Sequence, residues 1–371
     1  MVASRADTVN CRQLFIENAP LLDLRAPVEF AGGSFPGAVN LPLMTDSERE
    51  QVGIIYKNDG QDAAIAMGHK LVHGDVKAER VAAWHVFTKE NPQGYLFCFR
   101  GGLRSQIAQS WLREAGVEYP RITGGYKAMR RFLIDETERL VADRQFVIVA
   151  GRTGTGKTLL LNKIPQSLDL EGLANHRGSS FGRRPGDQPS QIDFENRLAV
   201  RLMKLCGGLD ATIFIEDESN RIGHLSLPHA LASQMPSWPM VMVEEPLEAR
   251  IDVIHRDYVT GLLAEHRRAD NENGFADFTE FLTDALYRVR KRLGGVKFAE
   301  INGLLQAALL AHASSGDAGL HRAWIKALLT DYYDPMYDYQ LEQKSQPILF
   351  RGTRDEVLAW QQEYRSAGLS V

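Results

Sequence analysis

Short apolar runs alternate with amphipathic stretches along the first 140 residues of the chain. Residues 20–24 and 95–98 are mainly apolar and lie between polar segments, which predicts two short buried strands. Residues 105–115 place their apolar side chains on one helical face, and Gly116 follows as the expected C-terminal cap. This alternation of strands and helices is typical of a small α/β domain.

A second pattern begins after residues 125–143, which predict a charged helix joining two domains. Residues 146–150 are continuously apolar, as expected of a central parallel strand that is covered on both faces. Later segments predict strands at 211–215 and 240–244, helices at 193–205, 275–293 and 321–329, and a C-terminal apolar run at 348–350 before a helix at 357–364. We therefore predict an α/β fold with two domains, residues 1–140 and residues 141–371, the second built on a parallel sheet and carrying a helical C-terminal elaboration.

The composition agrees with two folded domains and narrows the classes of function. A chain of 371 residues with 44% hydrophobic and 24% charged residues is typical of a soluble globular protein. It has no apolar run of the roughly 20 residues that span a bilayer and no apolar signal segment at its start, so we expect a cytoplasmic protein. The net charge of -4 gives no overall attraction to nucleic acid, so an RNA partner would have to use local basic patches.

Residues 151–158 carry the strongest chemical signal in the chain. They read Gly-Arg-Thr-Gly-Thr-Gly-Lys-Thr, which fits G-x-x-x-x-G-K-[ST], and they lie between the strand at 146–150 and a helix at 159–163. Glycines let backbone N–H groups close around phosphate oxygens, and the lysine adds a positive charge. The predicted phosphate-binding residues are Gly151, Thr153, Gly154, Thr155, Gly156, Lys157 and Thr158, with Lys157 also assigned a catalytic role.

An acidic residue at the end of a neighbouring strand is the expected partner of a metal at such a loop. Residues 212–215 are apolar or small and are followed directly by three acids, Glu216, Asp217 and Glu218. We predict that Mg²⁺ would use the Thr158 hydroxyl and either Glu216 or Asp217. The alternative is a solvated acidic turn after a strand.

The second chemical signal is a cysteine loop at residues 98–105. Cys98 stands at the end of a predicted strand, two glycines follow, and a helix begins just beyond them. Backbone N–H groups, the helix dipole and Arg104 would all favour a thiolate, so we predict that Cys98 is a nucleophile of lowered pKa. Such a loop suits a persulfide, a perselenide or a bound oxyanion, whereas Cys11 and Cys206 are interpreted as ordinary small apolar residues.

Residues 22–30, residues 35–42 and the cysteine loop resemble the three landmark segments of rhodanese domains, which carry sulfur on the loop cysteine. The resemblance implies a rhodanese-like N-terminal α/β domain followed by an α/β domain like that of P-loop NTPases. One feature departs from the rhodanese pattern: five residues separate Cys98 from Arg104, where rhodaneses commonly have four. The longer loop resembles that of rhodanese-fold phosphatases, so the domain alone does not imply sulfur carriage.

The fusion of these two modules resembles the tRNA 2-selenouridine synthases over nearly the whole chain, and that family shares the five-residue loop spacing. Further matching segments are residues 124–127 with Arg130, 170–182, 188–191 with 194–195, 216–219 with 222–223, and 333–337. The resemblance implies an RNA-modifying transferase that replaces the 2-thio sulfur of a wobble uridine in tRNA by selenium from selenophosphate. It also implies geranyl transfer from geranyl diphosphate to that sulfur. The motif does not determine which anion binds to the P-loop, and we infer that the diphosphate binds there. The expected partners are the tRNA anticodon loop and the enzyme that produces selenophosphate.

Two groups of polar and aromatic residues are candidates for binding the substrate. The donor-rich stretch after the P-loop helix predicts a loop contacting phosphate or RNA, made of His176, Arg177, Ser179, Ser180 and Arg183. The predicted RNA-binding residues are Lys127, Arg130 and Arg131, with Tyr333 and Tyr337 as stacking platforms. The alternatives are a solvated loop for the first group and aromatic core residues for the tyrosines. Arg250 and Arg256 are candidates for closing over an anion.

Two other functions fit the same motifs. A small-molecule kinase or nucleotide hydrolase fused to a sulfurtransferase or phosphatase domain predicts ATP turnover that depends on Lys157. A nucleotide-gated RNA-binding protein with a regulatory Cys98 predicts that no modified nucleoside depends on the protein.

Overall fold

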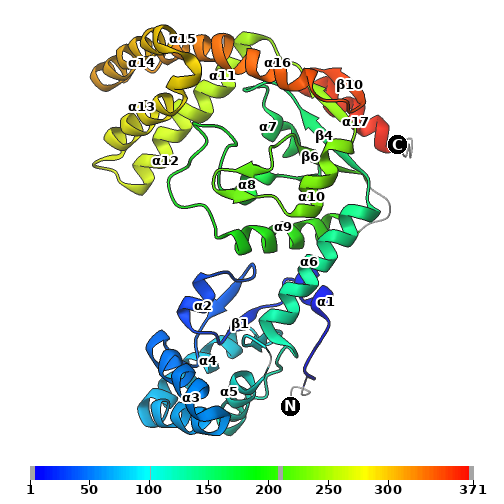
Figure 1. Cartoon of the computed structure of the whole chain (residues 1–371), viewed down its shortest axis with the longest axis vertical. Coiled ribbons are helices and arrows are strands. Elements are labelled where there is room, and N and C mark those ends of the chain that lie inside the picture. Colours follow the sequence, from blue (N-terminus) through cyan, green and yellow to red (C-terminus); the bar gives the residue numbers. More distant parts are fainter. Residues whose placement is uncertain (1–4, 101, 208–211, 367–371) are drawn as a thin grey trace. The chain divides into compact units, whose positions relative to one another are not determined.

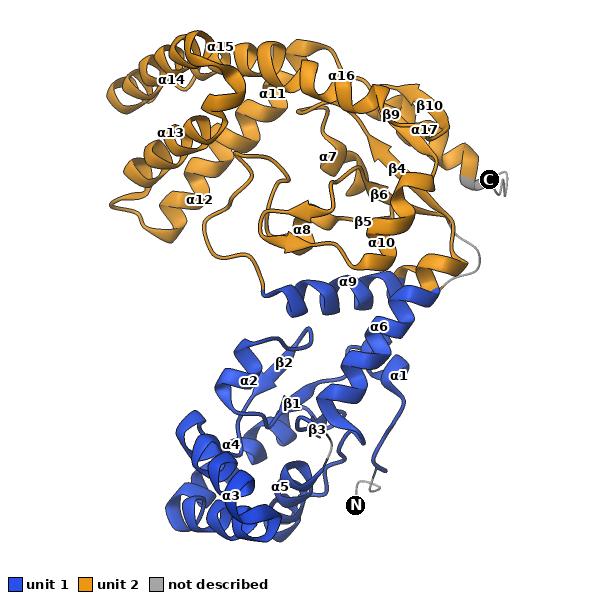
Figure 2. Cartoon of the chain, in the orientation of Figure 1, with its two compact units in different colours: residues 1–139, 190–204 blue, residues 140–189, 205–371 orange. Residues whose placement is uncertain are grey.

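The computed structural model describes residues 5–100, 102–207 and 212–366, and the chain forms two compact units (Figures 1 and 2). Unit 1 comprises Met1–Arg139 and Ser190–Lys204, and unit 2 comprises Leu140–Pro189 and Leu205–Val371. The chain therefore passes between the units three times, the first time within helix α6 (Gly125–Asp143). The predicted division into residues 1–140 and 141–371 placed residues 190–204 in the second domain, whereas in the structure they belong to unit 1.

Unit 1 is built on a three-stranded parallel sheet with the strand order β2-β1-β3. Its strands are β1 (Leu21–Asp23), β2 (Ala38–Asn40) and β3 (Tyr95–Phe97), and Leu22 is paired with both Val39 and Leu96. Its helices are α1 (Cys11–Ile16), α2 (Pro27–Ala31), α3 (Asp46–Leu71), α4 (Gly74–Glu90), α5 (Leu103–Glu114), most of α6 and nearly all of α9 (Gln191–Leu205). The strands and helices predicted in this region by the hydrophobic pattern are present.

The helices α3 and α4 between β2 and β3 were not predicted from the sequence. Few of their residues are buried, only Ala64 in α3 and three residues in α4, so neither helix shows the continuous apolar stripe that periodicity detects. Thr45 and Glu48 form a capping box that starts α3, and the helix kinks at Gly60, whose φ is +87°. This helical insertion supplies one wall of a pocket described below.

Unit 2 contains a five-stranded parallel sheet with the strand order β10-β9-β4-β6-β5. The strands are β4 (Phe146–Ala150), β5 (Ser167–Leu168), β6 (Ile213–Glu216), β9 (Met240–Val243) and β10 (Ile348–Gly352), and all five residues of β4 are buried. The short helices α7 (Lys157–Leu161), α8 (Leu170–Ala174) and α10 (His229–Gln234), the hairpin of β7 (Arg221–Ile222) and β8 (Leu225–Ser226), and α17 (Arg354–Ser366) complete this part. The predicted α/β class with a parallel sheet is confirmed.

The C-terminal half of unit 2 adds a helical layer in which successive helices pack side by side (Figure 1). Its helices are α11 (Leu247–His255), α12 (Gly261–Ala269), α13 (Gly274–Leu293), α14 (Gly295–Ser315), α15 (His321–Leu328) and α16 (Asp334–Glu342). Their core includes Phe278, Trp324 and Tyr333. Helix α14 was not predicted, whereas α13 and α15 match the expected segments.

No helix among the described residues is both long enough and apolar enough to cross a membrane.

Candidate functional site

The loop between β4 and α7 has the geometry of a phosphate cradle. Gly151, Gly154 and Gly156 have φ values of +155°, +84° and +74°, which favour glycine. A Cβ at Gly151 would lie 2.6 Å from the carbonyl oxygen of Val243, and a Cβ at Gly154 would lie 2.9 Å from that of Arg250. The backbone of this loop can therefore follow its path only with glycine at these positions.

The side chains of the loop hold it in this shape. The Nζ of Lys157 donates a 2.8 Å hydrogen bond to the Gly151 carbonyl, so the ammonium group crosses the loop. The Oγ1 of Thr155 donates to the Arg152 carbonyl at 2.8 Å. Because the lysine stands at the N-terminus of α7, its charge adds to the positive end of the helix dipole, and both favour an anion.

Three glutamates gather beside Thr158. The Thr158 hydroxyl lies 3.2 Å from Oε1 of Glu216 and 3.4 Å from Oε2 of Glu171, and the Glu171 N–H donates to Glu216 Oε2 at 3.0 Å. Burial, and then the charge of Glu171, raise the pKa of Glu216 well above its usual value and that of Glu218 to about 8. The crowding of these carboxyl groups makes the site favourable for positive charge.

Of the two predicted metal ligands, only Glu216 faces Thr158. Asp217 instead forms an ion pair with Lys344, so it is removed from the proposed ligand set. The strand β6 ends at Glu216, and the chain turns directly after it, because the Glu218 N–H donates to the Glu216 carbonyl at 3.0 Å. Glu218 was one of the three acids that the sequence analysis noted after this strand, whereas no local pattern indicated Glu171.

Among the described residues, no group of three or more His, Cys, Asp or Glu side chains is arranged to hold a metal ion by itself. Mg²⁺ at a phosphate site commonly uses only one or two carboxylates and takes its other ligands from phosphate and water. The Thr158 hydroxyl and Glu216 carboxylate fit that smaller set of ligands.

A buried ion pair supports the phosphate loop from the helical layer. Arg250 in α11 donates to the Thr153 carbonyl at 2.9 Å and binds both carboxylate oxygens of Asp334 in α16. Arg250 is buried, so it holds the loop in position and is not the free anion-closing arginine that the sequence predicted. Arg256, the other candidate, pairs with Asp257.

The predicted substrate loop lines a polar cavity of about 500 Å³ in unit 2. His176 and Arg183 form an isolated bridge across the loop. The cavity lining includes four of the five predicted residues, His176, Ser179, Ser180 and Arg183, together with His224 and Arg288. The fifth, Arg177, pairs with Glu265 and lies over the ring of Tyr258.

This cavity adjoins the acidic cluster through Gly178. Gly178 belongs to the cavity lining, and a Cβ added to it would lie 2.6 Å from Oε1 of Glu171 and 2.7 Å from Oε1 of Glu218. Gly178 therefore lies between the cavity and the glutamates beside Thr158.

The three predicted basic RNA-binding residues of α6 differ in their surroundings. Lys127 is exposed, Arg131 is paired with Asp135 one helical turn away, and Arg130 binds Glu195 and Asn196 of α9. Arg130 therefore holds two segments of unit 1 together.

The two tyrosines are also placed differently from the prediction. Tyr333 is only 7% exposed within the core of the helical layer, so its ring is not available for stacking on an RNA base. Tyr337 is half-buried, and its hydroxyl contacts the Met242 sulfur at 3.6 Å, which places it beside the sheet that carries the phosphate loop.

Cys98 follows β3 in unit 1, where the sequence placed it. Its Sγ lies 3.4 Å from the Ser105 hydroxyl, which in turn donates to the Gly102 carbonyl at 2.9 Å. The carbonyl of Cys98 accepts a hydrogen bond from the N–H of Tyr126 in α6, which fixes the start of the loop. The thiol is buried, and Gly101 lies outside the described residues.

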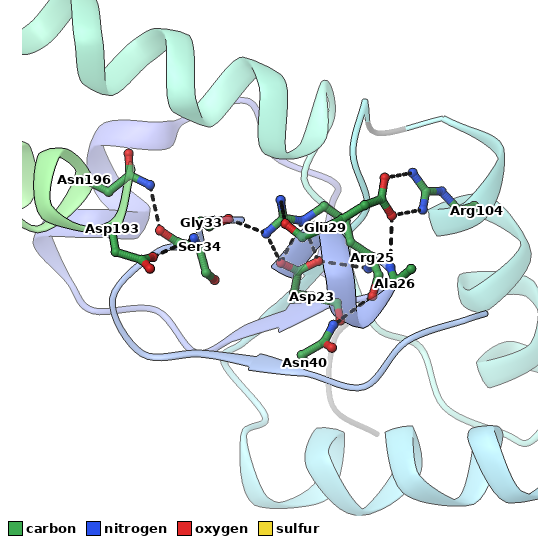
Figure 3. A network of polar contacts seen from close by, with 10 residues as sticks. All are labelled: Asp23, Arg25, Ala26, Glu29, Gly33, Ser34, Asn40, Arg104, Asp193 and Asn196. Carbon is green, nitrogen blue, oxygen red and sulfur yellow. Dashed lines mark hydrogen bonds and ion pairs between the residues drawn. The ribbon is translucent and has the colours of Figure 1, made fainter. Parts of the chain in front are cut away.

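Arg104 lies beside the cysteine loop and is held by a carboxylate. It donates two hydrogen bonds to Glu29, at 2.6 and 3.2 Å (Figure 3). Burial alone would lower the pKa of Arg104, but the hydrogen bonds and charge of Glu29, and to a smaller extent the charge of Cys98, raise it. Arg104 is therefore a fixed cation within electrostatic reach of the thiol, with its charge largely balanced by Glu29.

A polar network extends from Glu29 deep into unit 1 (Figure 3). Arg25 is 1% exposed and is held by the carboxylate of Asp23 and the carbonyls of Glu29 and Gly33. These contacts explain why residues 22–30 form a recognisable segment: its aspartate, arginine and glutamate together build the support of the cysteine loop.

The network continues into α9, which comes from the second half of the chain. The N–H of Ser34 donates to Asp193 at 2.7 Å, and Asn196 donates to the Ser34 carbonyl at 2.6 Å (Figure 3). No local pattern predicted that residues 190–204 pack within the unit that contains the cysteine loop.

Residues 144–367 match the family model described as the tRNA 2-selenouridine synthase AAA domain. Proteins named tRNA 2-selenouridine synthase are similar along nearly their full length. The one from Marinobacter nauticus is 52% identical over 97% of this chain and 98% of its own, and the one from Hahella chejuensis is 54% identical over 93% and 92%.

One solved structure also matches, the N-terminal domain of a Clostridium difficile 630 protein described as ATP/GTP binding. It is 30% identical and covers 31% of this chain and 88% of its own, with a TM-score of 0.27 that is too low to show a shared fold. The family model and the full-length relatives, together with the phosphate cradle and the cysteine loop, show that this enzyme belongs to the tRNA 2-selenouridine synthase family.

Proposed function

We propose that this enzyme replaces the 2-thio sulfur of a wobble uridine in tRNA by selenium, with selenophosphate as the donor and a geranylated intermediate. The observation that carries the proposal is the presence of a built phosphate cradle and a supported cysteine loop in one chain that matches these synthases from end to end. The phosphate cradle alone does not account for a reactive selenium, and the cysteine loop alone does not account for a phosphate-bearing donor.

We assign the first step to unit 2. The sulfur of 2-thiouridine attacks C1 of geranyl diphosphate, a C–S bond forms, the C–O bond breaks, diphosphate leaves with the electron pair, and N3 of the base releases its proton. Lys157, the loop amides and the positive end of α7 stabilise the leaving diphosphate. Thr158 and Glu216 would hold Mg²⁺, which when bound supplies further positive charge to the diphosphate.

The polar cavity beside the glutamates suits the approach of the nucleotide. His176, Ser180 and Arg183 line it as donors, and Gly178 of the same lining lies beside Glu171 and Glu218. Lys127 and Arg131 are solvent-facing and are proposed to contact the tRNA backbone.

We assign the second step to unit 1. Selenium of selenophosphate attacks C2 of the geranylated base, the C2–S bond breaks, and geranyl thiolate leaves and takes up a proton. Water then cleaves the Se–P bond, which releases phosphate and leaves 2-selenouridine with its N3 proton restored. Cys98 and Arg104 form the site for this step, and Glu29 balances the charge of Arg104.

The test is nucleoside mass spectrometry of tRNA from cells that lack the protein and are complemented with variants. Cys98→Ala is expected to accumulate geranylated nucleoside without selenouridine, and Lys157→Ala is expected to form neither. Cys206→Ala and Lys163→Ala are matched controls, because Cys206 lies outside the loop and the Lys163 side chain is 60% exposed. If 2-selenouridine persists in the cells without the protein, the proposed function is wrong.

A further inference from the structure

An apolar pocket in unit 1 lies beside the helix that follows the cysteine loop. Val52, Ile65 and Gly68 of α3 form one wall, and Leu103 and Ile107 of α5 form the opposite one. Its volume is about 230 Å³, and nearly all of its lining surface is apolar. Tyr56 and Leu103, two lining residues, are 60% and 41% exposed, so the pocket opens to solvent. Concave sites lined mainly by apolar side chains are the usual form of small-molecule binding sites.

The pocket is continuous with the packing around the reactive cysteine. Cys98 belongs to the same cluster of buried apolar side chains as four residues that line the pocket, Leu43, Met44, Val72 and Trp111. Arg104, on the first turn of α5, also lines it. A group that fills the pocket therefore reaches the immediate surroundings of the cysteine loop.

The charges of the pocket favour an uncharged hydrocarbon. Among the described residues that line it, Arg104 is the only Lys or Arg, and Glu29 already binds that guanidinium at 2.6 Å. The remaining polar lining residues are Gln61 and His69. The pocket offers no binding site for a diphosphate, so the group that it binds would carry no diphosphate.

The size of the pocket limits the occupant further. An apolar cavity of about 150 Å³ is enough for a six-carbon ring, so 230 Å³ has room for roughly nine or ten carbons. An apolar pocket in unit 2, lined by Thr153, Phe181 and Trp324, measures about 20 Å³ and has room for one water molecule. Only the first of these two pockets is large enough for a ten-carbon chain.

We propose that this pocket binds the geranyl group of the S-geranylated uridine while selenium replaces sulfur at the neighbouring cysteine loop. The inference rests on the proposed function, because the geranyl group is carried by the intermediate of that reaction. The pocket would place C2 of the base at the loop and would retain geranyl thiol as it leaves. The C2–Se bond forms, the C2–S bond breaks, and the departing thiolate takes up a proton.

Gly68 provides the variant that tests the pocket. A Cβ at Gly68 would meet only Val52, at 4.0 Å, so Gly68→Leu is expected to fill the pocket while the helix remains intact. Gly53→Leu is the matched control, because Gly53 lies on the same helix, is exposed, and has nothing within 4 Å of an added Cβ. Gly68→Ala gives an intermediate step with a single methyl group.

The assay supplies selenophosphate and a synthetic anticodon-loop RNA that already carries S-geranyl-2-thiouridine. Gly68→Leu is expected to form 2-selenouridine on the order of tenfold to fiftyfold more slowly than the unmodified enzyme, because two or three carbons lose their burial. Gly68→Ala should lie between them, and Gly53→Leu should match the unmodified enzyme. With a five-carbon S-dimethylallyl group, the loss in Gly68→Leu should be smaller, and this preference for chain length distinguishes a filled pocket from a misfolded unit.

The outcomes separate this inference from the proposed function. If the unmodified enzyme does not convert geranylated RNA, the geranylated route fails and the pocket loses its occupant. If the unmodified enzyme converts it and Gly68→Leu does so at the same rate, the pocket proposal alone is overturned. An equal loss on the ten-carbon and five-carbon substrates would also overturn it, since that result indicates structural damage.

Discussion

At the scale of single residues, the arrangement of acids beside Thr158 determines the character of the phosphate site. Glu171, Glu216 and Glu218 share a buried region, and each has a raised pKa, first because of burial. A cation or a proton must offset their mutual repulsion. The protonation of the site is therefore expected to change with pH, for Glu218 near pH 8.

The pKa of Glu218, about 8, predicts how stability depends on pH. An unfolded chain loses this proton near pH 4.5, whereas the folded protein keeps it until about pH 8, so deprotonation penalises the folded state. The free energy of unfolding should therefore fall as pH rises from 5 to above 8. Glu218→Gln should flatten this decline.

Thermal unfolding across pH in the absence of divalent cations measures the effect. Glu79→Gln is a suitable control, because Glu79 is an exposed glutamate of α4. Equal slopes for Glu218→Gln and the unmodified protein would contradict the assignment of the raised pKa to Glu218.

At the scale of elements, the packing of α9 against the segment after α2 is the least expected feature of unit 1. Gly33 makes this packing possible: its φ is +144°, and a Cβ there would lie 2.5 Å from the Ile192 side chain. The hydrogen bonds of Ser34 to Asp193 and Asn196 then secure the helix. A side chain at Gly33 should therefore separate α9 from the network that supports the cysteine loop.

Gly33→Ala is expected to destabilise the protein by about 2–3 kcal/mol, because the methyl group clashes with Ile192 in addition to straining the backbone. Gly37→Ala serves as the matched control. Its φ is +75° but nothing lies within 4 Å of an added Cβ, so it should cost only about 1 kcal/mol. Urea unfolding distinguishes the two, and equal losses would show that α9 is not tightly packed at Ile192.

At the scale of the whole molecule, the phosphate cradle and the cysteine loop belong to different compact units. The proposed chemistry is divided in the same way, with geranyl transfer in unit 2 and selenium insertion in unit 1. Each variant that disables one unit should therefore leave the other step intact.

Mixing the two variants tests this division. With geranyl diphosphate, selenophosphate and a 2-thiouridine RNA, neither Cys98→Ala nor Lys157→Ala alone should yield 2-selenouridine. An equimolar mixture should yield it, because geranylated RNA released by Cys98→Ala is a substrate for Lys157→Ala. Liquid chromatography of the digested RNA measures the product, and a mixture as inactive as its components would mean that the intermediate is not released.

The sequence by itself determined the features that depend on neighbouring residues. Residues 146–158 predict a buried strand, a glycine loop and a helix start, and the structure shows each of them, because strand burial, glycine torsion angles and helix initiation are local properties. Cys98 likewise stands at the strand end expected from residues 95–98. The α/β class with parallel sheets followed from the same local patterns.

Only the tertiary structure decided which distant side chains meet. Glu171 joins Glu216 across 45 residues, Arg130 binds Glu195 rather than facing solvent, and Tyr333 enters a core that several helices build together. The apolar pocket beside the cysteine loop arises because residues of α3, whose sequence carries no clear apolar stripe, line it together with residues of α5. Such contacts depend on the path of the whole chain, and a pattern of neighbouring residues contains no information about that path.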